Sequence, residues 1–177
     1  MTMTMNILLL SDIHTINPEL DAFMVDAREI LRSLGKVNML SSRLLAEIPD
    51  EFNTDEAHKA FVKGGIDLAA DNLTKENIQY DVVIGFSVGG TILWKAIENH
   101  HLSASQLVCI SSTRLRYETR NLPIKTMLFY GSEDKYAPNK QVMKKLADQF
   151  YIFPDVSHDF YKQDSLILAQ LFKKVFS

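Results

Sequence analysis

A serine lies at the centre of a glycine-rich segment in the middle of the chain. Residues 85–90 read Gly-Phe-Ser-Val-Gly-Gly, between an apolar run typical of a strand and a pattern typical of a helix. A sharp strand-to-helix turn strains its central residue and needs small residues two positions away on either side, which Gly85 and Gly89 provide. The pattern predicts a nucleophilic Ser87 at a helix N-terminus, where developing negative charge is favoured. A glycine-rich turn for packing or phosphate binding is the alternative.

Two later side chains could activate this serine. A serine hydroxyl becomes a good nucleophile when an imidazole takes its proton and a carboxylate orients that imidazole. Asp134 follows an apolar run, three residues after Gly131, and is favoured over its neighbour Glu133 for the carboxylate. His158 follows the last apolar run, whereas the other four histidines precede the acid: His14, His58, His100 and His101. Ser87, Asp134 and His158 are therefore predicted to form a catalytic triad.

The surrounding elements alternate along the chain and predict where these residues meet. Strands are predicted at 6–11, 37–40, 81–84, 106–110, 124–130 and 150–153, and helices at 18–34, 53–73, 88–100, 139–149 and 165–176, with loops at 41–53 and 111–123. Gly64 and Gly65 indicate a kink within the second helix. The alternation predicts one α/β domain over 1–177, a three-layer α/β/α sandwich with a mostly parallel sheet of about six strands and no lid.

Composition limits the partners and the compartment. The net charge is −3, with acidic and basic residues interspersed, which disfavours nucleic acid and a charged membrane surface as partners. Cys109 is the only cysteine and lies in an apolar run, so we expect a buried thiol. No signal or membrane segment is recognisable, and we expect a cytoplasmic protein. The sequence indicates nothing about oligomeric state.

Four short motifs together resemble the dienelactone hydrolase family of α/β-hydrolases. They are Asp-Ile-His-Thr-Ile-Asn at 12–17, the 85–90 segment, Gly-x-x-Asp-x-x-x-Pro at 131–138 and Ser-His-x-Phe at 157–160. The chain departs from that family at three positions: Ser87 replaces a cysteine, and Thr15 and Ser157 replace glycines. A serine nucleophile favours a carboxylesterase over a lactone hydrolase.

The resemblance also implies supporting residues. The backbone N–H groups of Ile13 and Val88 would form the oxyanion hole, and Asp12 would correspond to an acidic residue near the nucleophile that favours protonated His158. The loops at 13–18, 41–53 and 112–122 are expected to build a shallow site. Its expected lining residues are Asp12, His14, Phe86, Tyr136 and Phe160.

The sequence therefore predicts a serine hydrolase that cleaves small carboxylic esters or thioesters through an acyl-enzyme on Ser87, without a cofactor or a metal. A non-catalytic binding module of the same fold is one alternative. A remote alternative is a metallophosphoesterase, because residues 12–14 read Asp-x-His, although the further metal-binding blocks of such enzymes are missing.

Overall fold

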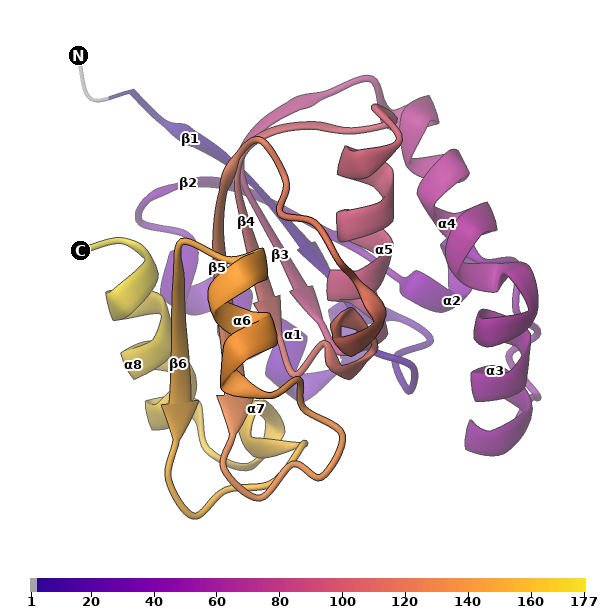
Figure 1. The fold of residues 1–177 in the computed structure, drawn as a ribbon. Coiled ribbons are helices and arrows are strands. Elements are labelled where there is room, and N and C mark those ends of the chain that lie inside the picture. The colour runs from indigo at the N-terminus through magenta and orange to yellow at the C-terminus, as the bar shows by residue number, and fades with distance from the viewer. Residues whose placement is uncertain (1–2) are drawn as a thin grey trace.

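The computed structural model describes residues 3–177 and contains a six-stranded parallel sheet (Figure 1). The order across the sheet is β2-β1-β3-β4-β5-β6, and every neighbouring pair is parallel. The strands are β1 Met5–Leu10, β2 Gly35–Leu40, β3 Gln79–Phe86, β4 Ser103–Ile110, β5 Lys125–Gly131 and β6 Gln149–Phe153. Since the chain runs from β1 to β2 and returns to place β3 on the other side of β1, the strand order reverses between β1 and β3. The carboxyl ends of the strands at such a reversal are the usual binding crevice in open α/β sheets.

Helices cover both faces of the sheet, which confirms the predicted three-layer fold. They are α1 Ala22–Leu31, α2 Ser42–Leu45, α3 Thr54–Ala60, α4 Ile66–Leu73, α5 Val88–Glu98, α6 Lys140–Leu146, α7 Phe160–Gln163 and α8 Ser165–Val175. Successive strand residues alternate between the two faces. Leu8 and Leu10 belong to the core beneath α4 and α5, whereas Ile7 and Leu9 belong to the core beneath α1 and α8. All four are fully buried, as expected of a strand covered on both sides.

Several helix boundaries differ from the predicted ones. The helix predicted at 139–149 ends at Leu146, because Ala147 is extended and Asp148 exchanges hydrogen bonds with Thr126 at the start of β5. The segment predicted as a loop at 41–53 contains α2, which begins where Ser41 Oγ accepts the N–H of Leu44. The first helix ends at Leu31, and Gly35 belongs to β2.

The predicted kink at Gly64-Gly65 separates α3 from α4. The turn between them, Phe61–Gly65, is a π-type turn in which Gly64 has φ +137°. Because of this turn, α3 continues past the end of the sheet in a direction of its own, as Figure 1 shows. The kink therefore determines where the residues of α3 lie relative to the strand ends.

The single cysteine of the chain lies in the core, as its apolar surroundings in the sequence predict. Cys109 is fully buried, with Sγ 3.6 Å from the carbonyl oxygen of Gly90, and burial raises the pKa of its thiol far above the ordinary value. The prediction of a buried thiol is confirmed. Over residues 3–177, every helix is too short or too polar to traverse a lipid bilayer.

Candidate active site

Ser87 occupies the sharp turn between β3 and α5. Its backbone has φ +53° and ψ −117°, a strained conformation for a residue with a side chain. Hydrogen bonds hold the turn from both sides: Ser87 N–H donates to the carbonyl of Ile110 at 2.7 Å, and Ser112 Oγ donates to the carbonyl of Ser87 at 2.8 Å. A Cβ on Gly89 would lie 2.5 Å from the carbonyl oxygen of Leu10. The strand–turn–helix context predicted for the serine is therefore present. The close approach of Leu10 requires glycine at position 89.

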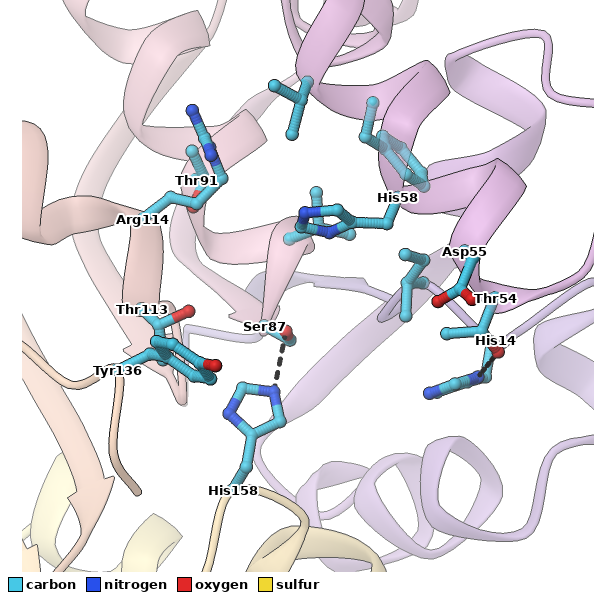
Figure 2. A pocket seen from close by; sticks show the side chains of 14 residues that line it. His14, Thr54, Asp55, His58, Ser87, Thr91, Thr113, Arg114, Tyr136 and His158 are labelled. Atoms are coloured by element: carbon cyan, nitrogen blue, oxygen red, sulfur yellow. Dashed lines mark hydrogen bonds between the residues drawn. The ribbon is translucent and has the colours of Figure 1, made fainter.

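Ser87, His158 and Asp134 form one hydrogen-bonded chain. Ser87 Oγ lies 3.1 Å from His158 Nε2, and His158 Nδ1 lies 2.7 Å from Asp134 Oδ2 (Figure 2 shows the first contact). Since the carboxylate only accepts hydrogen bonds, Nδ1 carries the imidazole proton and Nε2 is free to accept the serine proton. The Asp134 side chain is only 2% exposed, whereas the neighbouring Glu133 is exposed. This arrangement can perform nucleophilic catalysis assisted by a general base.

Two further contacts hold the acid and the base in place. The second oxygen of Asp134 accepts the N–H of Tyr136 at 3.1 Å. Ser111 Oγ donates to the carbonyl of His158 at 2.7 Å, which fixes the backbone that carries the imidazole. The three side chains therefore have restricted positions before any substrate binds.

The surroundings of His158 favour its protonated form. Burial lowers the pKa of His158, but the hydrogen bond that His158 donates to Asp134 and the negative charge of Asp134 outweigh burial, with smaller contributions from Asp159 and Asp12. The pKa consequently lies above the ordinary value of 6.5. An imidazole of this kind is a stronger base, but it is available as a base only at higher pH.

The two residues predicted to supply the oxyanion hole lie at the cavity that contains the serine. Val88 is the first residue of α5, and Ile13 lies in the loop after β1, next to β3 in the sheet. Both residues line the cavity that contains Ser87. Within residues 3–177 neither N–H donates a hydrogen bond to a backbone carbonyl. Two free donors at this position can stabilise a negatively charged oxygen.

Asp12 contributes the negative charge near His158 that the resemblance implies, but its side chain is paired with a cation beneath the site. Its side chain is buried, and one oxygen lies 2.6 Å from Lys162 Nζ and accepts the Tyr161 hydroxyl at 2.7 Å. The other oxygen accepts the N–H of His14 at 2.9 Å. Burial raises the pKa of Asp12, but the charge and hydrogen bond of Lys162 outweigh it, so the pKa is lowered. Asp12 therefore lies beneath the site, paired with a cation, and does not line the cavity.

Phe86 and Phe160 do not line the cavity either, so this part of the prediction is wrong. Both are fully buried in the core beneath α1 and α8. Phe86 packs edge-on against Phe23, and Phe160 packs against Phe153. The alternation of side chains along β3 directs Phe86 to this face, away from the cavity. The other two predicted lining residues, His14 and Tyr136, do line the cavity.

The cavity has a volume of about 340 Å³ and opens over Ser87 (Figure 2). Of the loops expected to build the site, 13–18 and 112–122 contribute to its lining, the latter through Thr113 and Arg114 of the 3-10 helix Thr113–Tyr117, whereas 41–53 does not. Sequence reasoning missed six further lining side chains, five from α3 and the turn after it and one from α5. They are Thr54, Asp55, His58, Phe61, Val62 and Thr91. The amphipathic pattern of 53–73 predicts a helix, but nothing in it indicates that the helix begins over Ser87.

The Asp-x-His segment does not form a metal site. The Asp12 carboxylate is occupied by Lys162, and His14 Nδ1 lies 3.4 Å from Thr54 Oγ1. Across residues 3–177, histidine, cysteine and acidic side chains nowhere gather in a group of three that could hold a metal ion. These donor sets do not fit the metallophosphoesterase alternative.

Comparisons with known structures agree with this fold. The chain is similar to ClbQ from the colibactin NRPS/PKS pathway, with a TM-score of 0.62, 13% identity and coverage of 98% of this chain and 95% of that one. It is also similar to a putative hydrolase from Agrobacterium vitis S4, with a TM-score of 0.65 at 12% identity over 98% and 88% of the two chains. A third similar structure is XC6422 from Xanthomonas campestris, an α/β serine hydrolase without a lid, with a TM-score of 0.58 at 13% identity over 98% and 82%.

The sequence itself matches one family. No curated protein sequence matches the chain significantly. The match to the family described as serine hydrolase (FSH1) covers residues 52–158, more than half of the chain, and includes Ser87, Asp134 and His158. The finer resemblance to dienelactone hydrolases stays a prediction. With its lidless α/β-hydrolase fold and this match, the chain belongs to the serine hydrolase (FSH1) family.

Proposed function

We propose that this protein hydrolyses small carboxylic esters or thioesters through an acyl-enzyme on Ser87. His158 Nε2 takes the Ser87 proton as Oγ attacks the carbonyl carbon, and Asp134 stabilises the resulting imidazolium. His158 then gives the proton to the leaving alcohol or thiol. A water, deprotonated by the same nitrogen, releases the acid. The observation that carries the proposal is the hydrogen-bonded chain from Ser87 through His158 to Asp134.

We assign the oxyanion hole to the N–H groups of Ile13 and Val88. What supports the assignment is that both line the cavity beside Ser87 and that both lack a backbone acceptor within the described residues. One donor of this kind contributes about 10²–10³ in rate. The dipole of α5 adds to the stabilisation of the developing charge.

The dimensions of the cavity support a small substrate. A volume of about 340 Å³ is near the lower end for small-molecule sites. Exposed side chains such as His14 and Tyr136 form its edge, so substrate enters directly from solvent. The proposed reaction needs no cofactor. The single buried cysteine supports a cytoplasmic location.

The test is hydrolysis of p-nitrophenyl esters from acetate to octanoate, with the matching thioesters assayed in parallel. The wild type is expected to turn over the short esters, and Ser87→Ala to retain only background hydrolysis. Equal rates in the two proteins would overturn the proposal.

The alternative is a non-catalytic binding module of the same fold. A fluorophosphonate probe distinguishes the two, because it labels an activated serine without requiring the natural substrate. Labelling of the folded wild type, absent in Ser87→Ala, is expected. Failure to label folded protein would favour the binding module.

A further inference from the structure

A buried hydroxyl in the cavity has no hydrogen-bond partner. Thr91 is only 3% exposed and lines the cavity, yet its Oγ1 has no partner among residues 3–177. A helical threonine often bonds to the carbonyl four residues earlier, which here is that of Ser87. That carbonyl already accepts the Ser112 hydroxyl and the Gly90 N–H. Since a buried polar group without a partner is costly, a ligand oxygen that accepted a hydrogen bond from Thr91 would gain free energy.

A guanidinium without a carboxylate partner lies beside this hydroxyl. Arg114 lines the same cavity and is partly buried, and its guanidinium lies over the ring of Tyr117, 5.2 Å from the ring centre. It forms no salt bridge within residues 3–177. Figure 2 shows Arg114 next to Thr91. A planar guanidinium with a neighbouring hydroxyl is well suited to bind a carboxylate.

The acidic groups nearby do not neutralise Arg114. Glu118 lines an adjoining hollow but is paired with Lys95 at 2.8 Å. Asp67 also lines that hollow and is exposed. Asp55 lines the cavity over Ser87 on the side opposite Arg114, near His14 (Figure 2). The positive charge of Arg114 is therefore available to a ligand in the cavity.

The positions of Thr91 and Arg114 relative to His158 indicate which part of a substrate would reach Arg114. His158 must protonate the leaving group, so the leaving group lies on the His158 side of Ser87. In Figure 2, Thr91 and Arg114 lie on the other side of Ser87 from His158. This is the side where the acyl group of the substrate would extend. Thr91 is one helical turn beyond Ser87, about 6 Å along α5.

We propose that Arg114 and Thr91 form a subsite for a carboxylate at the far end of the acyl group, so that the preferred substrates are half-esters or half-thioesters of short dicarboxylic acids. The guanidinium pairs with the carboxylate, and the Thr91 hydroxyl donates to one of its oxygens. The inference rests on the proposed hydrolase function, because it assigns the acyl side from the role of His158. The two claims are separable, because binding of a free dicarboxylate requires no turnover.

The first experiment measures binding of free adipate to the Ser87→Ala variant by calorimetry, with neutral adipamide as the comparison ligand. Adipate is expected to bind more tightly than adipamide. Adding Arg114→Gln should weaken adipate binding about 10- to 100-fold, the usual loss when a charged hydrogen bond is removed. The matched control is Arg120→Gln, which removes the same charge from an exposed position on the same connection. Equal binding of the two ligands, or equal weakening by the control, would overturn the subsite.

Thr91→Val tests the hydroxyl separately. The substitution keeps the shape of the side chain and removes a buried group without a partner, so the thermal unfolding midpoint should stay the same or rise. Adipate affinity should fall at the same time. A lower midpoint together with unchanged adipate affinity would assign Thr91 a purely structural role and remove it from the subsite.

The second experiment compares kcat/KM for mono-p-nitrophenyl adipate and p-nitrophenyl hexanoate. The wild type should prefer the adipate ester, and Arg114→Gln should reduce the ratio at least about tenfold. Turnover of hexanoate without any preference for adipate would overturn the subsite and leave the hydrolase intact. Binding of adipate without turnover of either ester would support the subsite and overturn the proposed hydrolysis.

Discussion

His158, the proposed acceptor of the Ser87 proton, lies where several carboxylates favour its charged form. The largest electrostatic influence comes from Asp134, in direct contact, and a smaller one comes from Asp159, the next residue in the chain. Because only the neutral imidazole is a base, activity should rise with pH through a pKa above the ordinary value of 6.5. Residues that contribute charge without touching the substrate can therefore move the pH dependence.

Asp159→Asn should lower the pKa of His158, because it removes a negative charge and changes the side-chain shape very little. The rising limb of kcat/KM against pH should move to lower pH, with an unchanged maximum. The shift should shrink at high salt, because Asp159 is exposed. Asp155→Asn, another exposed aspartate near the end of β6, is the control. A profile identical to that of the wild type would contradict the assigned influence of Asp159.

The neighbouring acids Glu133 and Asp134 should differ strongly in their effect on activity. Asp134→Asn should reduce kcat about 10⁴-fold, because an amide no longer holds the imidazole in the productive tautomer. Glu133→Gln should have little effect, because that side chain is exposed and does not contact His158. Steady-state kinetics of the two variants on one ester would decide between the acids. A large loss in Glu133→Gln alone would reverse the assignment.

At the scale of elements, the loops after β5 and β6 meet at one glycine. A Cβ on Gly131 would lie 2.3 Å from the carbonyl oxygen of Val156 and 2.6 Å from that of Ser157. The loop that carries His158 can therefore approach the end of β5, where Asp134 lies, only because residue 131 has no side chain. The hydrogen bond from Glu133 N–H to the Val156 carbonyl at 3.0 Å closes the same junction.

Gly131→Ala should separate the acid from the base. Overpacking at this contact should cost about 1–3 kcal/mol of stability. Displacement of His158 by about 1 Å should reduce kcat/KM about 10²-fold. Lys135→Ala, at an exposed position in the same loop, should change neither. Denaturant unfolding and ester kinetics measure the two effects, and an unchanged kcat/KM would show that the junction tolerates a methyl group.

The elements also show what a single sequence can and cannot predict. Continuous apolar runs such as Ile7–Leu10, bounded by polar residues, are typical of strands covered on both faces, so the parallel sheet and the order of the strand-end residues were predictable. Thr91 and Arg114 were not, since a threonine within an apolar helix and an arginine in a polar connection have no local signature. They come together only where α5 and the segment after β4 converge. The ion pair of Asp12 could not be predicted either, because its partner Lys162 is distant in sequence.

At the scale of the whole molecule, Asp12 connects the beginning of the chain to its end. It follows β1, whereas Lys162 and Tyr161 lie on α7, close to the C-terminus. The same carboxylate accepts the N–H of His14 in the loop that carries Ile13. One buried group therefore fixes the loop of the proposed oxyanion hole to the segment that follows His158.

Asp12→Asn should destabilise the protein by about 2–3 kcal/mol at neutral pH, because it removes a charged hydrogen-bond acceptor that is 1% exposed. The pKa of Asp12 is lowered in the folded protein, so its contribution is present above the ordinary value of 3.8 and disappears as pH falls through the folded pKa. The stability difference between variant and wild type should therefore shrink below about pH 4. Urea unfolding at several pH values checks this, with exposed Asp26→Asn as the control. A difference that is constant with pH would contradict the ion pair.

The burial of Cys109 has a practical consequence. Its thiol is fully buried, and its raised pKa leaves almost no thiolate to react. Thiol-specific dyes should therefore leave the native protein unlabelled, so a cysteine introduced at an exposed position is the sole point of attachment without any change to the background sequence. A Val62→Cys variant would place a fluorophore at the edge of the cavity. Such a protein could serve as a reagentless optical sensor for molecules that enter the cavity.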